Sequence, residues 1–479
     1  MADELTSRRR MLVLAICCMS LLIVSLDNTV LNVALPAMRG EFDASVSGMQ
    51  WTIDAYTLVL ASLLMLAGST ADRIGRRKVF RAGLTVFTLG SVLCSLAPNL
   101  ESLVAFRMVQ AVGGSMLNPV AMSIITNTFT EPRERARAIG VWGGVVGISM
   151  AAGPLVGGLL VDSVGWRSIF WINLPVGLAA LLLTTRYVPE SRAPHPRRPD
   201  PIGQLLVIGL LGALTYAIIE APTAGWTSPL ILSFAGAALL ALLGLLRYEP
   251  RRAEPLIDLR FFRSAPFTGA TVIAVSAFAA LASFLFLSTL YLQDVRGLDA
   301  LHAGLWMLPM AAMTLVCAPL SGRLVGSRGP RLSLLVAGVA MTASGVLFAA
   351  FEAEDTGGTR FLGYVLFGLG FGFVNAPITN TAVAGMPRAQ AGVAAAVAST
   401  SRQIGQTLGV AVIGAVLASG VASSYARDFA GASRPAWWII AGCGLAVLLL
   451  GALSSGRWAR GTAERTAQRL EREPQPVRA

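Results

Sequence analysis

The stretch Leu26–Pro36, which reads LDNTVLNVALP, begins inside the apolar segment 11–35, ends one residue beyond it and contains one acidic residue, Asp27. A helix of about 20 apolar residues is long enough to cross the hydrocarbon core of a bilayer. A carboxylate at mid-membrane depth costs about 3 kcal/mol on insertion scales, so it requires a partner or a function. A second acid, Asp54, lies in the next apolar segment. Two acids at this depth predict a proton-driven transporter rather than a soluble enzyme.

The composition of the whole chain places it in the membrane class. Of its 479 residues, 54% are hydrophobic and 13% are charged, whereas soluble proteins average about 25% charged residues. The net charge of +12 does not indicate nucleic-acid binding, because the basic residues lie in short loops between apolar runs. The first apolar segment lacks a signal-peptide cleavage site, so it is interpreted as the first span.

Fourteen apolar runs are long enough to be membrane spans. They are 11–35, 49–70, 79–97, 101–125, 136–161, 168–187, 203–220, 229–247, 267–292, 303–325, 332–351, 361–385, 391–420 and 436–456. The loops on one side, with the two tails, hold 30 Lys and Arg residues, whereas the opposite loops hold six. The positive-inside rule therefore predicts that both termini are cytoplasmic. The expected location is the bacterial cytoplasmic (inner) membrane.

A weak internal repeat indicates two related bundles. Gly68–Arg77 follows the second span and Gly322–Arg331 follows the tenth, and both place glycines seven residues apart before an arginine. The expected fold is an all-α polytopic membrane protein with two six-helix bundles, over 1–190 and 267–456. A linker with two extra membrane helices is expected over 191–266. A cytoplasmic polar tail, disordered or interfacial, is expected over 457–479.

Three motifs carry a resemblance to a known family. They are GSTADRIGRRK at Gly68–Lys78, LVAFRMVQAVG at Leu103–Gly113 and GISMAAGPLVGG at Gly147–Gly158. Together they resemble the major facilitator superfamily, specifically its fourteen-helix drug:proton antiporter branch of the EmrB/QacA and methylenomycin-resistance type. The resemblance covers essentially the whole chain. It implies the major facilitator fold, with a two-helix hairpin inserted between the two bundles.

The first motif implies a cytoplasmic gate that strengthens in one conformation. The gate residues are Gly68, Asp72, Arg73, Gly75, Arg76 and Arg77. The glycines permit a tight turn, and Asp72 is expected to pair with a nearby arginine or to cap a neighbouring helix. The residues alone also fit a positively charged loop with a helix cap. The second-half copy has Gly326 in place of the aspartate, so any gate is asymmetric.

The second motif places Arg107 inside the fourth span. At 1.5 Å per residue it lies about 9 Å from the outer boundary, with Asp27 roughly 13 Å and Asp54 about 8 Å inside. An unpaired intramembrane arginine is improbable, so Arg107 is expected to pair with Asp27 or Asp54. One interpretation is a static ion pair that fixes helix packing. The other is a proton-coupling site of Asp27, Asp54 and Arg107, with Asp27, the deepest acid, as the main coupling carboxylate.

The third motif contains Gly147, Gly153, Pro154, Gly157 and Gly158. Proline breaks the helical hydrogen-bond ladder, and glycines allow close helix packing. Membrane helices in general also use Gly and Pro. By resemblance, this arrangement in the fifth span is the mark of an antiporter.

Other polar residues in the spans are candidates for a substrate cavity. Those singled out are Asn28, Asn32, Gln110, Asn375, Thr379, Asn380 and Arg402. The alternative interpretation is that they form hydrogen bonds between helices. The motif resemblance does not decide between the two.

The expected function is a proton-coupled secondary antiporter that exports amphipathic drugs or antibiotics by alternating access. The sequence has no Walker loop, no zinc-ligand spacing and no nucleophile elbow, so neither ATP, a metal nor an enzyme activity is expected. Protons are the expected coupling ion, with no cofactor. The expected partners are a small amphipathic substrate and the lipid bilayer, and a monomer is expected. The alternatives are an exporter of an endogenous metabolite or lipid-like compound, a proton symporter that imports a nutrient, and a sensor or enzyme on a transporter fold.

Overall fold

The computed structural model describes residues 6–193, 200–252, 254–351, 357–384, 386, 391–420 and 425–472. Within these ranges, every regular element is a helix. The chain divides into two compact units, one of Met1–Pro199 with Leu298–Leu305 and the other of Asp200–Gly297 with Trp306–Ala479. Residues 194–199 of the predicted linker and 473–479 of the predicted tail lie outside the described residues.

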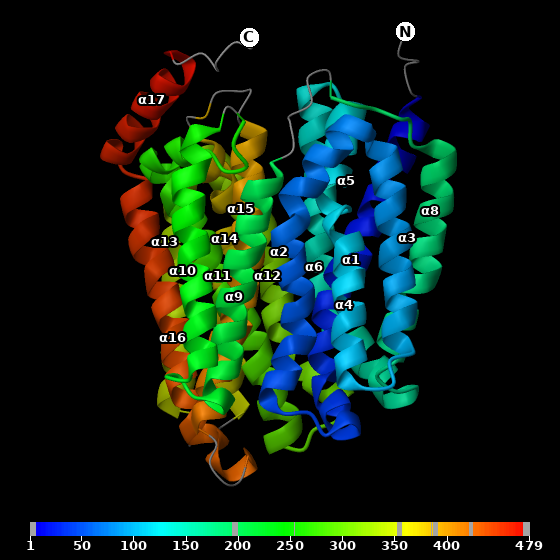
Figure 1. The fold of residues 1–479 in the computed structure, drawn as a ribbon, viewed down its shortest axis with the longest axis vertical. Coiled ribbons are helices and arrows are strands. Elements are labelled where there is room, and N and C mark those ends of the chain that lie inside the picture. Colours follow the sequence, from blue (N-terminus) through cyan, green and yellow to red (C-terminus); the bar gives the residue numbers. More distant parts are fainter. Residues whose placement is uncertain are drawn as a thin grey trace. The chain divides into compact units, whose positions relative to one another are not determined.

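The first unit is built from helices α1 to α8 together with the first residues of α12 (Figure 1). The bounds are α1 Ser7–Phe42, α2 Val46–Ile74, α3 Arg76–Ser95, α4 Leu100–Ser115, α5 Asn118–Thr128, α6 Pro132–Ser163, α7 Ser168–Trp171 and α8 Asn173–Tyr187. α4 and α5 lie within one candidate span, and so do α7 and α8. α1 packs against α6, and α3 packs against α4.

The helix starts in this unit follow from local side-chain chemistry. The side chains of Thr6, Ser45 and Asn99 precede α1, α2 and α4, and each accepts a hydrogen bond from a backbone N–H of the first turn. Such caps satisfy donors that the helix itself leaves unpaired. Phe80 and Phe87 of α3 are fully buried. The apolar interior is therefore formed by the inward faces of helices whose ends are fixed by polar caps.

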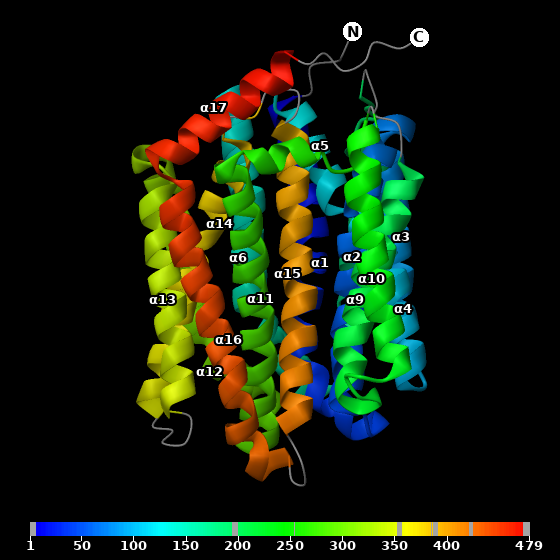
Figure 2. The same cartoon turned by 60° about the vertical axis from the view of Figure 1, so that its left-hand side comes forward.

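The second unit contains the helices from α9 onward, including most of α12 (Figure 2). The bounds are α9 Pro201–Ala224, α10 Pro229–Tyr248, η1 Glu249–Arg251, η2 Leu259–Arg263, α11 Ala265–Leu290, the π-helical η3 Tyr291–Val295, α12 Ala300–Arg328, α13 Pro330–Phe351, α14 Gly357–Val383, α15 Ala391–Gly420, α16 Tyr425–Ser454 and α17 Arg457–Arg472. α13 packs against α14 and α16, and α11 packs against α14, α15 and α16.

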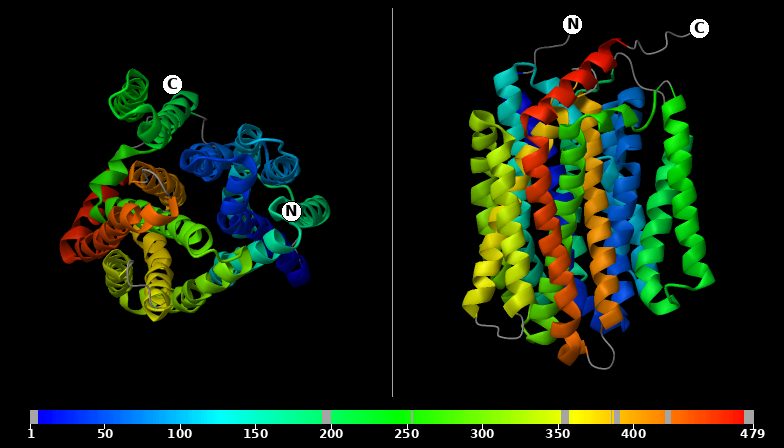
Figure 3. Two further views of the ribbon diagram at one scale, coloured as in Figure 1. Left: turned by 90° about the horizontal axis from the view of Figure 1, so that it is seen from below. Right: turned by 90° about the vertical axis from the view of Figure 1, so that its left-hand side faces the viewer.

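Helices α9 and α10 form a hairpin (Figure 3). Within the second unit, α9 of this hairpin packs against α15. The outer helix, α10, exposes a row of leucines, among them Leu232, Leu239, Leu240 and Leu243. A contiguous apolar surface of this kind is stable only against lipid or another apolar partner. The exposed face of α10 therefore requires lipid or another apolar partner to cover it.

Two buried carboxylates tie the two ends of this hairpin together. Asp200 caps α9, because its Oδ1 accepts a hydrogen bond of 3.0 Å from Gly203 N. The same oxygen accepts a hydrogen bond of 3.1 Å from the Tyr248 hydroxyl at the end of α10. Glu249 Oε2 accepts a hydrogen bond of 3.4 Å from Ile257 N. A Cβ at Gly203 would lie 2.6 Å from Glu249 Oε1 and 2.8 Å from Asp200 Oδ2. Only glycine allows both acids to approach the start of α9 so closely.

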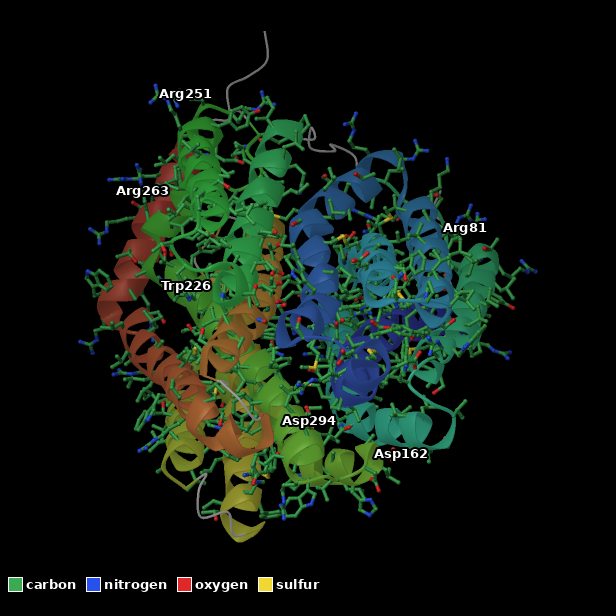
Figure 4. The ribbon with its side chains drawn as sticks, turned by 60° about the horizontal axis from the view of Figure 1, so that its bottom comes forward. Arg81, Asp162, Trp226, Arg251, Arg263 and Asp294 are labelled. Carbon is green, nitrogen blue, oxygen red and sulfur yellow. The ribbon has the colours of Figure 1, made fainter. Side chains whose placement is uncertain are left out.

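The predicted fold class is confirmed. Among the described residues, thirteen helices are long and apolar enough to cross a membrane, and the bent helix α6 raises the number to fourteen. Charged side chains such as Arg81 of α3 and Arg263 of η2 point outward near the helix ends (Figure 4). The predicted domain boundaries remain a prediction. Within the predicted tail, residues 457–472 form α17, which contacts η2 and α11.

Candidate functional site

Asp27 is the centre of a buried polar network in the first unit. It lies near the middle of α1 and is only 5% exposed. Its Oδ2 accepts a hydrogen bond from Arg107 Nη1 of α4, and the two side chains form an ion pair. Its Oδ1 accepts hydrogen bonds of 2.9 Å from Gln110 Nε2 and from Asn173 Nδ2. Three donors from α4 and α8 thus compensate one carboxylate.

The donors are themselves held in place by further contacts. Ser91 Oγ of α3 accepts from Gln110 Nε2 at 2.7 Å and from Asn173 Nδ2 at 3.1 Å. Arg107 Nη1 also donates to Gln110 Oε1 at 2.7 Å. Its guanidinium lies over the Tyr56 ring of α2, 4.2 Å from the ring centroid. Because every member contacts at least one other side chain, the charge of Asp27 is held at one position between α1, α3, α4 and α8.

Asp54 is buried but lies outside this ion pair. Its Oδ1 accepts a hydrogen bond of 3.4 Å from Thr57 Oγ1, one turn further along α2. Within the described part of the chain, its Oδ2 has no hydrogen-bond partner. The structure therefore brings Asp27 and Arg107 together and leaves Asp54 separate from them. The predicted roles of these three residues in proton coupling remain predictions.

The glycines and proline of the third motif lie on α6 where it packs against α1 and the start of α12. The two halves of α6, Arg133–Met150 and Ala152–Ser163, meet at an angle of 41°. Pro154 cannot donate to the carbonyl four residues earlier, that of Met150, so the bend falls where the ladder is broken. Gly147 lies in the segment before this bend.

Helix packing around the bend leaves no room for side chains. A Cβ at Gly153 would collide with Thr29 Oγ1, and one at Gly157 would lie 3.1 Å from Val30 Cγ1. A Cβ at Gly158 would lie 2.5 Å from Leu301 Cα of α12. Asp162 Oδ2 accepts a hydrogen bond of 2.8 Å from Leu301 N, so the end of α6 is also joined to the first turn of α12 (Figure 4).

The gate motif forms a tight turn between α2 and α3. Arg76 donates to Asp72 Oδ1 from Nε at 3.0 Å and from Nη2 at 2.7 Å. Gly75 has a φ of +125°, which favours glycine. A Cβ there would lie 2.6 Å from Glu190 Oε1, and the same oxygen accepts a 3.0 Å hydrogen bond from Arg77 N. The segment after α8 therefore closes over the turn.

The other two gate residues have weaker contacts. A Cβ at Gly68 would meet only Pro119 Cβ, at 3.7 Å, and Arg73 is exposed. Asp72 was expected either to pair with a nearby arginine or to cap a helix, and in the structure it pairs with Arg76. Its role as a gate stays a prediction.

The candidate cavity residues fall into separate groups. Gln110 belongs to the Asp27 network, whereas Asn32 Nδ2 donates to the Asn28 carbonyl of its own helix at 2.8 Å. In the second unit, Arg402 Nη2 of α15 donates to Thr379 Oγ1 of α14 at 2.6 Å.

The two remaining candidates of the second unit lie on α14 beside Thr379. Asn375 lies one turn before Thr379, and Asn380 is exposed. The side-chain hydrogen bond from Arg402 to Thr379 links α15 to α14. A role of any of these side chains in substrate binding stays a prediction.

Sequence reasoning did not single out several residues of the sites described above, among them Ser91, Asn173, Tyr56 and Glu190. Asn173 follows Phe170 and Trp171 near the start of the sixth span. An amide side chain inside an apolar span was the available signal. Ser91 and Tyr56 carry no signal, because single serines and tyrosines are common in membrane helices. Glu190 lies just beyond the end of α8, where charged residues are ordinary.

The fold and the buried charge network define a polytopic membrane transporter. The family model described as Major Facilitator Superfamily matches residues 17–410, so the chain belongs to the major facilitator superfamily. The expectation that it is not an enzyme is thereby confirmed, because this is a family of transporters.

Three bacterial resistance proteins resemble this chain over most of its length. The Multidrug resistance protein Stp of Mycobacterium tuberculosis (strain CDC 1551 / Oshkosh) is 38% identical over 413 residues, 86% of this chain and 77% of that protein. The Tetracenomycin C resistance and export protein of Streptomyces glaucescens is 37% identical over 416 residues, with the same coverages. The Methylenomycin A resistance protein of Bacillus subtilis (strain 168) is 32% identical over 455 residues, 95% of this chain and 94% of that protein. The resemblance to the drug-resistance branch is therefore confirmed.

Two solved structures share the fold. One is a bacterial homolog to the human lysosomal transporter Spinster, in an inward-facing and unoccupied conformation, with a TM-score of 0.65 and 19% identity. The match covers 98% of this chain and 100% of that chain. The other is a bacterial homologue of the human drug peptide transporters PepT1 and PepT2, with a TM-score of 0.64, 14% identity and coverages of 96% and 99%. At these identities the likeness concerns the fold alone.

Proposed function

We propose that this chain is a proton-coupled antiporter that exports amphipathic drugs or antibiotics across the bacterial cytoplasmic membrane by alternating access. The buried Asp27 carries the proposal. A carboxylate between membrane helices, compensated by one guanidinium and two amides, can take up or release a proton when its access to water changes. The names of the drug-resistance relatives support export of this class of compound.

The proton gradient is a sufficient source of energy for such export. One charge that crosses 100 mV releases about 2.3 kcal/mol, which supports a gradient of about 40-fold for an uncharged substrate because each tenfold ratio requires about 1.4 kcal/mol. Protons are the proposed coupling ion. No ATP and no cofactor are required, and the proposed working unit is a monomer in the lipid bilayer.

The direction of transport is proposed from the packing of α6. An antiporter must not carry protons without exchanging substrate, so its helices have to stay tightly packed around the bend. Gly157 contacts α1 at Val30, and Gly158 contacts the start of α12; such small-residue contacts support a rigid bend. The distribution of basic residues supports cytoplasmic termini.

A reconstituted system tests the coupling. Full-length protein is placed in proteoliposomes with a stored proton gradient and a pH-sensitive dye, and ethidium is added as the probe. The wild type is expected to release the gradient on addition of the probe. Asp27→Asn is expected to bind the probe but not to release protons. Asp43→Asn is the matched control, because Asp43 is an exposed acid at the end of the same helix with a φ of 49°, which asparagine tolerates.

The outcomes separate the candidate mechanisms. Proton release by Asp27→Asn at the wild-type rate would remove Asp27 from the coupling mechanism. Entry of probe and protons in the same direction would make the chain a symporter.

A second candidate is export of a compound that the host itself makes. The printed name of the Streptomyces glaucescens relative pairs resistance with export of one compound, tetracenomycin C, which supports export of a specific compound rather than of drugs in general. Comparison of the culture medium of a deletion strain with that of the complemented strain tests it. A small molecule that is exported only by the complemented strain would favour this candidate over general drug efflux.

A further inference from the structure

A second arginine lies within a membrane helix, in the other unit. Arg402 is eleven residues from the start of α15, or about 16 Å along the helix axis. Its Nη2 donates to Thr379 Oγ1 at 2.6 Å, and its Nη1 donates to Ser399 Oγ at 3.3 Å. Both acceptors are neutral hydroxyls, so these contacts orient the guanidinium without balancing its charge.

The contrast with Arg107 shows what Arg402 lacks. The Arg107 guanidinium is balanced by the Asp27 carboxylate. Arg402 uses two of the five N–H donors of a guanidinium. Its Nε is buried without a hydrogen-bond partner, as is Nη2 of Arg107, so the counter-charge is what differs between the two. Across the ranges that the structure describes, neither an ion pair nor a hydrogen bond joins Arg402 to a carboxylate. An intramembrane charge without a counter-charge marks a functional site.

The surroundings of Arg402 suit an aromatic body. The Phe278 ring of α11 lies with its centroid 5.8 Å from Arg402 Cζ. Phe371 of α14 packs edge-on against Phe278, with a centroid distance of 5.2 Å. Three mutually packed helices, α11, α14 and α15, therefore hold a guanidinium beside a pair of rings. Thr379, which orients the guanidinium, is exposed, so the arrangement is open on that side.

We propose that Arg402 binds the acidic group of an exported substrate, so that the substrates of this chain include amphipathic aromatic anions. A carboxylate, sulfonate or phenolate accepts hydrogen bonds from the unused N–H groups of the fork, which are charge-assisted and favour two parallel contacts. The aromatic part of the substrate packs on Phe278. The proposal rests on the proposed export function and adds the charge class of the substrate.

Two dyes with the same aromatic skeleton give a direct test. 1-Anilinonaphthalene-8-sulfonate is an anion, and N-phenyl-1-naphthylamine is its uncharged analogue without the sulfonate. Their binding is measured by fluorescence on full-length protein in lipid nanodiscs, with empty nanodiscs subtracted. Arg402→Gln is expected to weaken sulfonate binding at least tenfold and to change binding of the neutral dye less than twofold.

Matched variants separate the binding site from general charge and from folding. Arg263→Gln removes an exposed arginine from the same unit (Figure 4), and it is expected to bind both dyes like the wild type. Arg402→Lys keeps the charge but lacks the fork, so its sulfonate affinity is expected to fall between those of the wild type and Arg402→Gln. If Arg402→Gln does not fold, Thr379→Val replaces it, because it removes the hydroxyl that orients the guanidinium.

The proposal is overturned if the wild type binds the sulfonate no more tightly than Arg402→Gln, or if both dyes lose affinity equally. For Thr379→Val, unchanged sulfonate affinity overturns it in the same way. Failure of the antiport mechanism is recognised separately. In that case neither dye releases a stored proton gradient in wild-type proteoliposomes, while the difference in sulfonate binding between wild type and Arg402→Gln persists.

Discussion

Replacement of Arg107 by methionine is the perturbation that most directly tests the buried network. The side chains of Arg107 and Asp27 are 0% and 2% exposed, so water cannot take the place of the guanidinium. Asp27 would keep the hydrogen bonds from Gln110 and Asn173 but lose its only charged donor among the described residues. The contact between the guanidinium and the Tyr56 ring would be lost as well.

The expected losses in the free energy of unfolding can be compared in a double-mutant cycle. Removal of one partner of a buried ion pair costs about 3–5 kcal/mol, whereas an apolar pair of similar volume is often tolerated. In Arg107→Met with Asp27→Leu, Gln110 and Asn173 lose one acceptor each and Gln110 Oε1 loses its Arg107 donor, at about 1 kcal/mol per hydrogen bond. The double variant is therefore expected to be more stable than the sum of the single losses implies, with a coupling energy of about 2 kcal/mol or more.

The measurement is reversible unfolding of the purified protein by SDS in mixed micelles, followed by circular dichroism for the wild type, the two single variants and the double variant. Additive losses, with a coupling energy near zero, would refute the view that the two charges compensate each other. The control pair is Arg10 and Glu134, a partly exposed ion pair of 2.7 Å in the same unit. Its coupling energy is expected to stay below about 1 kcal/mol.

Three further predictions concern packing and the loops. Gly158→Leu is expected to abolish substrate-driven proton release or to cause a proton leak, because its side chain would enter the backbone of α12 at Leu301. Gly140→Leu on the same helix, where a Cβ meets nothing within 4 Å, should behave like the wild type in the same dye assay. Glu190→Ala is expected to lower the unfolding free energy by about 1 kcal/mol, since Arg77 N loses its part-buried acceptor, and an unchanged SDS midpoint would contradict this. Glu249→Gln is expected to leave the midpoint temperature of thermal unfolding unchanged or to raise it, because it removes the charge of one of two neighbouring buried carboxylates, the other being Asp200. A large decrease of this temperature would show that the charge of Glu249 stabilises the fold.

The sequence by itself determined the membrane class, the helical fold and the family. The length and apolarity of the runs were sufficient, because a bilayer admits few alternatives to a hydrogen-bonded helix of about 20 residues. The same physics marked Asp27 and Arg107 as exceptional, since each is costly in lipid without compensation. The bend of α6 also followed from a local rule, because Pro154 removes a specific backbone hydrogen bond.

The choice of partners was decided only by the tertiary structure. Asp27 and Asp54 were equal candidates for Arg107 in the sequence, because position along a helix gives depth but not the direction in which a side chain points. The structure pairs Arg107 with Asp27 and adds Asn173 from α8, a residue 146 positions away along the chain. Likewise, nothing local distinguishes Arg402 from Arg107. What separates them is whether packing of distant helices brings a carboxylate to the guanidinium, and that depends on contacts that no single segment encodes.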